Sequence, residues 1–336
     1  MMKKYLIPSI LIQLIVLITS CESDINMIYE SQGKPVVYCL LNPKDSVQYL
    51  RVSRSFIFRG NPGTGEISPD SLILDQDFYA YLELEKPDGT RDIHYFEITD
   101  LTRRDSGLFP VEGLVIFKTN CKVEGGKEYG LYINFPNLPK LIAGSVTVVN
   151  PVTILDPNPL PGREITLLDD QGYLVRWTKS IQFAVYQPVI RFIFLEGNRN
   201  FQIIKEVDCP QQLVYGDSEN AILTNFVNGA GFLNDLVTNL APPDSGMQRK
   251  IIGFDLLLTT GGPELSVFIR SGQNAVASFT GLDEYSNLDG AVGIYASQTF
   301  SGTFNNRFSD LTINYLAGNE KTRHLGFLKF NEDFHP

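Results

Sequence analysis

Hydrophobic and polar residues alternate along much of this chain, and this period of two constrains the fold more than any other sequence feature. The run from Phe78 to Glu85 (FYAYLELE) places Phe78, Ala80, Leu82 and Leu84 on one face of an extended backbone. Similar runs recur and are separated by turn residues such as Pro87-Asp88-Gly89. The pattern predicts a mainly β protein built from short, half-buried strands.

The predicted strands fall into two blocks. Residues 34–153 have the strand lengths and turn spacing of an immunoglobulin-like β-sandwich. Residues 154–162 (ILDPNPLPG) contain three prolines and are predicted to be a linker. Residues 163–336 are predicted to form a second β-rich domain with one or two short helices. We therefore expect two successive β domains.

One segment departs from the period of two. From residue 218 to residue 240, apolar side chains recur at helical spacing, and Pro242-Pro243 follows them. This pattern predicts a helical insertion near 218–240 that ends before the prolines. Gly229 and Gly231 lower its helix propensity, so two short helices are the alternative.

Neighbouring runs predict several hairpins: 78–85 with 93–98, 114–123 with 128–135, 165–168 with 173–178, and 251–260 with 264–270. Nearer the C-terminus, Gly290 and Gly293 are predicted to allow positive φ or a close backbone approach. Val292, Ile294 and Phe300 are then predicted to enter a buried strand.

The N-terminus has the layout of a bacterial lipoprotein signal. Lys3 and Lys4 precede an apolar run that ends in Leu17-Ile18-Thr19-Ser20-Cys21. The run is shorter than the ~20 residues of a spanning helix, and no stop-transfer pattern follows. We expect residues 1–20 to be a signal peptide, Cys21 to carry the lipid, and residues 21–33 to form a flexible tether.

Charge and the residues behind the lipid indicate a location. Glu22 and Asp24 follow the cysteine closely, and in Bacteroidota this resembles the signal that sends lipoproteins to the cell exterior. The predicted location is the outer membrane, with the protein lipid-anchored and facing outward. The formal net charge of −10 disfavours nucleic acid as a partner.

Three cysteines lie beyond the anchor: Cys39, Cys121 and Cys209. A disulfide between Cys39 and Cys121 is compatible with an oxidising envelope, because both fall in the first predicted domain. No tight cysteine framework appears, however. The favoured interpretation is that all three are small, buried hydrophobic residues.

The sequence contains few residues that could form an active site. His94, His324 and His335 are far apart and lack metal-ligand spacing, so neither a zinc site nor another cofactor is expected. His94 is expected to be a structural strand residue and His335 to be solvated. The carboxylate pairs Asp169-Asp170 and Asp283-Glu284 leave a glycan hydrolase as an alternative. We predict a protein without enzymatic activity.

Two kinds of surface feature point to binding or modification. Tyr79 and Tyr81 share the polar face of a predicted strand, where they could stack on sugars or contact a partner; the favoured interpretation is that they cover a second sheet or the seam between the two domains. Asp45-Ser46-Val47 and Asp70-Ser71-Leu72 resemble the site where Bacteroidota attach O-glycans to envelope proteins. Ser46 and Ser71 are therefore candidate glycosylation sites.

Four stretches together resemble one lipoprotein family of Bacteroidota, domain-of-unknown-function family 4249. They are Val36 to Pro43 followed by Gln48 to Ser55, then Glu128 to Phe135 (EYGLYINF), and Ser286 to Ser297 (SNLDGAVGIYAS). The resemblance implies an outer-membrane lipoprotein, often encoded beside TonB-dependent receptors, and it carries no catalytic residues.

The predicted function follows from the lipid anchor, the β pattern and the lack of a recognisable catalytic set, and the family resemblance implies the TonB-dependent context. We expect a surface-exposed lipoprotein that acts as a non-enzymatic accessory or binding subunit of a TonB-dependent nutrient uptake system. One alternative is a structural subunit of an outer-membrane protein assembly or secretion machine. A surface glycan hydrolase is the other alternative.

Overall fold

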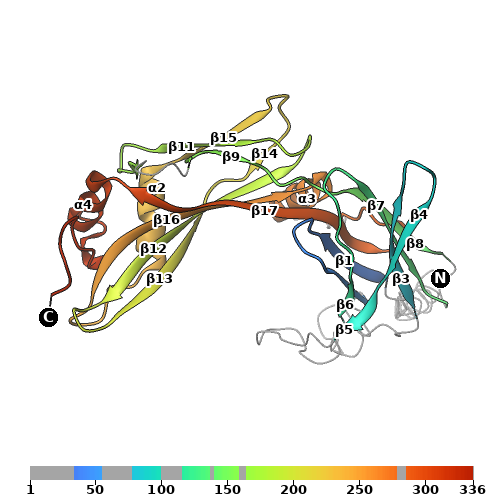
Figure 1. Cartoon of the computed structure of the whole chain (residues 1–336), viewed down its shortest axis with the longest axis horizontal. Helices are drawn as coiled ribbons and strands as arrows, with labels where there is room; N and C mark the ends of the chain where they lie inside the picture. The colour runs from blue at the N-terminus through green and yellow to red at the C-terminus, as the bar shows by residue number, and fades with distance from the viewer. Residues whose placement is uncertain are drawn as a thin grey trace, which may run out of the picture.

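The structure is a computed structural model that describes residues 34–54, 78–99, 116–136, 140–158, 164–277 and 285–335. Two β units lie at opposite ends of an elongated molecule, and one long strand, β17 (Val292–Phe308), runs through both (Figure 1). The chain is mainly β, as the period of two predicts, with an immunoglobulin-like sandwich in the N-terminal part.

The N-terminal unit is a two-layer sandwich. One layer contains β1 (Pro35–Leu41), β2 (Gln48–Arg54), β6 (Ile116–Thr119) and β5 (Glu97–Thr99), which join the first half of β17. The other layer has the order β4-β3-β7-β8, formed by β3 (Tyr79–Glu85), β4 (Arg91–Tyr95), β7 (Glu128–Asn134) and β8 (Ile142–Thr147). Alternate residues of both layers fill the core between them, including Leu41, Leu50, Leu82 and Leu131.

The C-terminal unit also has two layers. Long strands β12 (Val185–Gly197), β13 (Gln202–Pro210) and β16 (Gln248–Gly261) continue the same sheet beyond β17 in the order β13-β12-β16-β17. A three-stranded sheet of β15 (Ile222–Val227), β11 (Tyr173–Thr178) and β9 (Ile154–Asp156) covers them. Trp177, Phe192, Phe254 and Phe308 are buried in the core of this unit.

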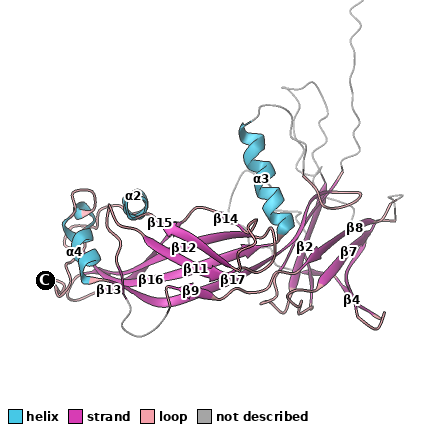
Figure 2. Ribbon diagram, turned by 90° about the horizontal axis from the view of Figure 1, so that it is seen from above, coloured by secondary structure: helices cyan, strands magenta, loops and turns pink. Residues whose placement is uncertain are grey.

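Short elements complete the C-terminal unit. Two-residue strands β10 (Glu164–Ile165) and β14 (Val214–Tyr215) pair with β17 and β12. The helices are α2 (Gly229–Asn239), α3 (Pro263–Ala277), α4 (Asp310–Gly318) and the 3-10 turn η2 (Arg323–Leu325). In Figure 2, α3 projects away from the sheet near the junction of the two units, whereas α2 and α4 lie at the far end.

The shared strand changes the predicted division of the chain. The first half of β17 pairs in parallel with β1, from Val36 opposite Val292 to Leu41 opposite Ser297. Leu288 and Tyr295 are buried in the N-terminal core, and the Tyr295 hydroxyl donates to the Tyr129 carbonyl at 3.0 Å. A segment assigned by sequence to residues 163–336 therefore completes the sandwich of residues 34–153.

The predicted linker is also partly structured. Residues 154–156 form β9, which pairs with β11, while residues 159–163 lie outside the described residues. Within the described residues, the strand ends at Asp156, directly before the first of the three prolines, Pro157. Proline cannot donate to a β ladder, so it stops the strand without preventing pairing before it.

The helical insertion predicted near 218–240 is shorter than expected. Residues 222–227 form strand β15 against β11, with alternating exposed and buried side chains. The helix begins after Asn228, whose side chain accepts a hydrogen bond from the Gly231 amide at 3.0 Å. Apolar residues at 222, 223, 226 and 227 fit a strand as well as a helical stripe, and the asparagine cap separates the two.

The predicted hairpin over 251–260 and 264–270 is wrong in its second half, which is helix α3. Pro263 begins the helix, where its missing amide costs nothing, and Glu264 lies in the first turn, where the helix dipole favours a carboxylate. Leu265, Phe268 and Ile269 recur at helical spacing. The apolar pattern in this short segment was compatible with the two-residue period of a strand and with the 3.6-residue period of a helix.

Two other predicted hairpins are replaced by longer-range pairings. β6 pairs with β2 and β5, whereas β7 pairs with β3 and β8, so the Gly125-Gly126 turn connects different layers. β10 pairs in parallel with β17, and β11 pairs with β15 and β9. The turn between Leu168 and Gln171 persists. Turn chemistry locates a reversal but does not identify the partner strand.

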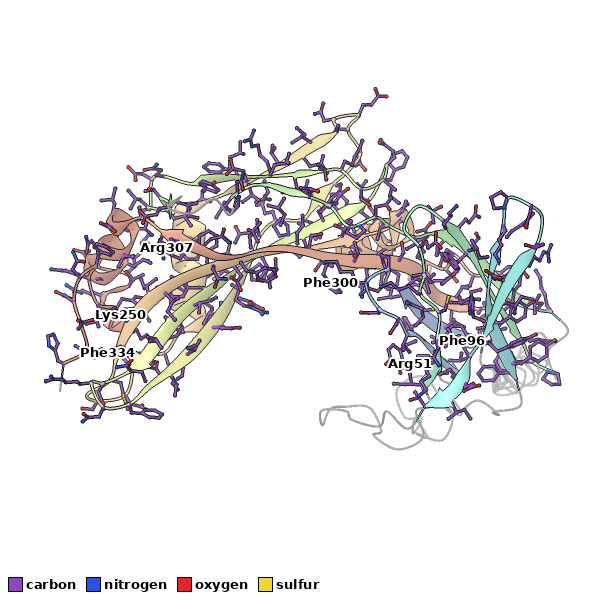
Figure 3. The ribbon with its side chains drawn as sticks, in the orientation of Figure 1. Arg51, Phe96, Lys250, Phe300, Arg307 and Phe334 are labelled. Carbon is purple, nitrogen blue, oxygen red and sulfur yellow. The ribbon has the colours of Figure 1, made fainter. Side chains whose placement is uncertain are left out.

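The predicted hairpin of 78–85 with 93–98 forms as β3 with β4 as far as Tyr95, but Glu97 and Ile98 belong to β5, which pairs with β6 in the other layer. The two glycines also behave as predicted, because Gly290 has φ +83° and Gly293 has φ +114°. Ile294 is buried, but Phe300 is 46% exposed, which corrects its expected burial. Figure 3 labels Phe300 on the side of β17 that faces the space between the two units.

Candidate functional site: a tyrosine surface on the N-terminal unit

Four tyrosines gather on the outer face of the β4-β3-β7-β8 sheet, and we call Tyr79, Tyr81, Tyr95 and Tyr132 the tyrosine face. Strand register brings them together: Tyr81 lies opposite Tyr95 on one side and opposite Tyr132 on the other. Tyr79 begins β3 one step along the same face, opposite Asn134. The predicted surface position of Tyr79 and Tyr81 is confirmed: Tyr79 is 52% exposed and Tyr81 is half-buried beside its neighbours.

The outward orientation of these rings follows from the core beneath them. Leu82 and Leu131 lie at alternate positions of β3 and β7 and are fully buried between the two layers. Because strand side chains alternate, their neighbours Tyr81 and Tyr132 must face outward. A shift of one residue in either strand would bury a phenol and expose a leucine, so the core determines the register of the tyrosines.

The rings contact each other across the strands. The centroids of Tyr81 and Tyr95 are 5.6 Å apart, and those of Tyr81 and Tyr132 are 5.1 Å apart with planes inclined by 24°. A Cβ at Gly130 would lie 2.7 Å from the Tyr132 ring, so this ring occupies the space above the glycine. Such aromatic pairs stabilise a sheet and limit ring motion.

Polar groups surround the tyrosine face. Asn134 donates to the Tyr79 hydroxyl at 2.5 Å, and Glu83 is 3.4 Å from Arg91. Burial and the adjacent Glu83 carboxylate raise the pKa of Tyr81 above its usual value. Its phenol therefore remains protonated at neutral pH and can donate a hydrogen bond. A surface of amphipathic rings with a polar border is suited to binding rather than to proton transfer.

The sequence indicated half of this surface. Tyr79 and Tyr81 share one run, so alternation alone puts them on one face. Tyr95 and Tyr132 come from other strands, and their approach depends on a register that only the folded sheet defines. Tyr132 lies in EYGLYINF, where the same alternation could have marked it as outward-facing.

The other predicted site residues are dispersed. Cys21, Ser71, Asp283 and Glu284 lie outside the described residues. Ser46 is exposed in the turn between β1 and β2, where the preceding Asp45 accepts a hydrogen bond from Asn42 at 2.8 Å. Its hydroxyl is therefore sterically available for modification, and Asp45 has a structural role in the turn.

The acidic and histidine candidates do not converge. Asp169 pairs with Lys321 at 3.1 Å, and the adjacent Asp170 is exposed. His94 is a half-buried strand residue, while His324 and His335 are exposed. Within the described ranges, no group of three or more histidine, cysteine or acidic residues could hold a metal ion. No helix in the described part of the chain is long and apolar enough to cross a membrane.

The three cysteines have the favoured arrangement: Cys39, Cys121 and Cys209 are buried and unpaired. Burial raises the pKa of each thiol, to about 11 for Cys121 and about 12 for Cys209. Neutral, buried thiols are inert and pack as small hydrophobic groups.

Comparison with known proteins identifies no family for this chain, so its fold alone defines its structural class. No family model matches, and no curated protein matches. A crystal structure of the IG1 and IG2 domains of DIP-gamma is 11% identical, covers 68% of this chain and 89% of that chain, and has a TM-score of 0.16. A crystal structure of CBD12 from CALX1.2 is 8% identical, covers 80% and 100%, and has a TM-score of 0.15. The chain is a mainly β protein whose two units share one strand.

Proposed function

We propose that this chain is a lipid-anchored accessory subunit that binds an outer-membrane barrel of a TonB-dependent uptake system, with the tyrosine face as its docking surface. The tyrosine face is the observation that carries the proposal. Tyr79 and Tyr95 are 52% and 59% exposed on a regular sheet, where rigid aromatic rings can bury a large area with little loss of side-chain entropy.

The anchor contributes to the same proposal. A chain of the length of residues 21–33 spans at most ~45 Å when fully extended, so lipid at Cys21 would hold the N-terminal unit near the membrane. Tethering raises the local concentration of the subunit around a membrane partner, and a modest interface then suffices. We also propose that the chain is a member of domain-of-unknown-function family 4249 and that it faces the cell exterior.

A single substitution tests the docking surface. Tyr95→Ala should weaken co-purification of a barrel protein with the full chain from detergent-solubilised outer membranes by roughly 30-fold, the loss of an interface hot spot. Phe201→Ala is the matched control, because Phe201 is 57% exposed in the C-terminal unit. If the parental chain retains no barrel, or Tyr95→Ala retains as much barrel as Phe201→Ala, the proposed function is wrong.

The anchor has its own test. Cys21→Ala should move the chain from the membrane fraction to the soluble fraction, because the thioether and its acyl chains are lost. Ser23→Ala, two residues away, should leave the chain in the membrane. Fractionation with an alkaline wash measures both variants, and Cys21→Ala that stays in the membrane would contradict lipid attachment at this residue.

A further inference from the structure

Most strands that end a sheet in the described structure are protected against pairing with another chain. At one end of the large sheet, β13 carries charged residues and ends at Pro210; at the other, β5 has three residues. β4 is charged, β9 has three residues, and the outer side of β8 is hydrogen bonded to Asp289, whose amide donates to the Ala143 carbonyl at 2.8 Å. Charges, proline, shortness and covering segments all prevent edge-to-edge association.

β15 is the exception among these strands. Its sequence, ILTNFV, has six residues without a charge or a proline, and β11 is its only strand partner in the described part of the chain. Ile222 and Phe226 are 47% and 60% exposed, and Leu174 beside Phe226 is 46% exposed. A neutral, apolar edge strand of this length is a template for adding another strand.

We propose that β15 pairs with β15 of a second copy of this chain, antiparallel, across a two-fold axis at Thr224. In this register, Ile222 lies opposite Phe226 of the second copy, and Thr224 lies opposite Thr224 of the second copy. All of these side chains point to the same face of the combined sheet. No like charges meet in this register. The two β15-β11-β9 sheets then become one continuous sheet, and the apolar outer residues of both copies become contiguous.

The self-complementary pattern favours a second copy over a foreign strand. The edge strand β13 differs in this respect. If β13 paired with β13 of a second copy about Lys205 or Glu206, like charges would lie opposite each other. β15 has no such obstacle at Thr224, and the exposed Ile222 and Phe226 flank it symmetrically, two residues away on either side. Thus β15 has the composition for self-pairing that β13 lacks.

The surroundings of Thr224 allow a charge test that spares the monomer. Thr224 is exposed and lies opposite Arg176 of β11. Thr224→Glu gains a cross-strand cation within its own chain but opposes a second glutamate in the pair. Thr224→Lys opposes Arg176 and is therefore the less favourable of the two substitutions within its own chain. Circular dichroism of each variant verifies that the fold is retained.

Sedimentation of the full chain in detergent measures the association. The parental chain should shift from monomer to dimer with rising concentration, whereas Thr224→Glu and Thr224→Lys should each dimerise at least tenfold more weakly. An equimolar mixture of the two variants should recover dimer, because glutamate then faces lysine. A parental chain that stays monomeric, or a mixture that does not recover, overturns the proposal.

Disulfide trapping tests the register directly. Thr224→Cys should form a covalent dimer under mild oxidation, since opposite Cβ atoms in an antiparallel pair approach disulfide range. Ile204→Cys is the matched control, because Ile204 is 65% exposed on β13, the edge strand whose charges disfavour self-pairing. The parental chain, which contains Cys21, sets the background. Covalent dimer of Thr224→Cys that does not exceed that of Ile204→Cys contradicts the proposed pairing.

Discussion

Replacing Gly293 by alanine should destabilise the N-terminal unit by about 3 kcal/mol, through backbone strain and a clash together. Gly293 has φ +114° and lies opposite Val37 in the parallel pairing of β17 with β1. A Cβ there would fall 2.1 Å from the Val37 carbonyl oxygen. Backbone surrounds the position, so the clash cannot be relieved by rotating a side chain, and the two strands must separate.

Gly89→Ala provides the matched control. Gly89 also has positive φ, +81°, but a Cβ there would meet nothing within 4 Å. It should therefore show the strain of positive φ alone, about 1 kcal/mol. Urea unfolding followed by far-ultraviolet circular dichroism compares the two variants. Equal losses of stability would contradict the close approach of β17 to β1.

Glu196→Ala should destabilise the C-terminal unit by about 3–5 kcal/mol, the usual cost of leaving a buried charge without its partner. The Arg249 side chain is 5% exposed, and its guanidinium lies 2.7 Å from the Glu196 carboxylate. Arg249 also donates to the Leu325 carbonyl at 3.0 Å, which connects β16 to the C-terminal segment. Without Glu196, the contacts left to the cation within the described residues are that carbonyl and the Phe194 ring, 5.3 Å away.

Two further variants test whether the loss of stability comes from the unpaired charge of Arg249. Glu206→Ala removes an exposed carboxylate 3.5 Å from Arg191 and should cost less than about 1 kcal/mol. Adding Arg249→Leu to Glu196→Ala should recover stability, because the unpaired charge is then absent. Fluorescence of Trp177, which is buried in this unit and is the only tryptophan, follows unfolding in urea. Glu196→Ala that behaves like Glu206→Ala would contradict the role of this ion pair.

The Glu196 contribution should also depend on pH. Burial acts to raise the pKa of Glu196, but hydrogen bonds from Lys205 and Arg249 outweigh it, and the pKa is lowered from the ordinary 4.5. A lowered pKa in the folded state means that the stabilisation is present above pH 4.5 and is lost as pH falls further. The stability difference between the parental chain and Glu196→Ala should shrink across that acidic range.

Several features of the fold could be read from local patterns. Alternation in Phe78 to Glu85 identified β3 and its outward tyrosines, and Pro87-Asp88-Gly89 located the reversal that follows it; here the next strand, β4, is also the pairing partner. Gly290 and Gly293 were recognisable as backbone positions that favour glycine. These features depend on a few adjacent residues, whose sterics and hydrogen bonds act whatever the rest of the chain does.

The candidate site was only partly predictable for the same reason. Tyr81 was recognisable as outward-facing from its own strand, but its contacts with Tyr95 and Tyr132 require three strands in register. The core sets that register, because a slip of one residue would expose Leu82 and Leu131. Likewise, β15 is an edge strand only because of the strands that lie beside it in the folded sheet. The sequence ILTNFV does not show which strands these are.

The amino-acid sequence by itself determined the β class of this protein, the position of most turns and the outward face of β3. Only the tertiary structure decided that residues 222–227 form a strand and 263–277 a helix, that β6 and β7 belong to different layers, and that β17 serves both units. Local periodicity specifies which face of a segment is apolar. The partner that covers this face is chosen by long-range packing, which lowers the free energy only when distant segments bury their apolar faces together.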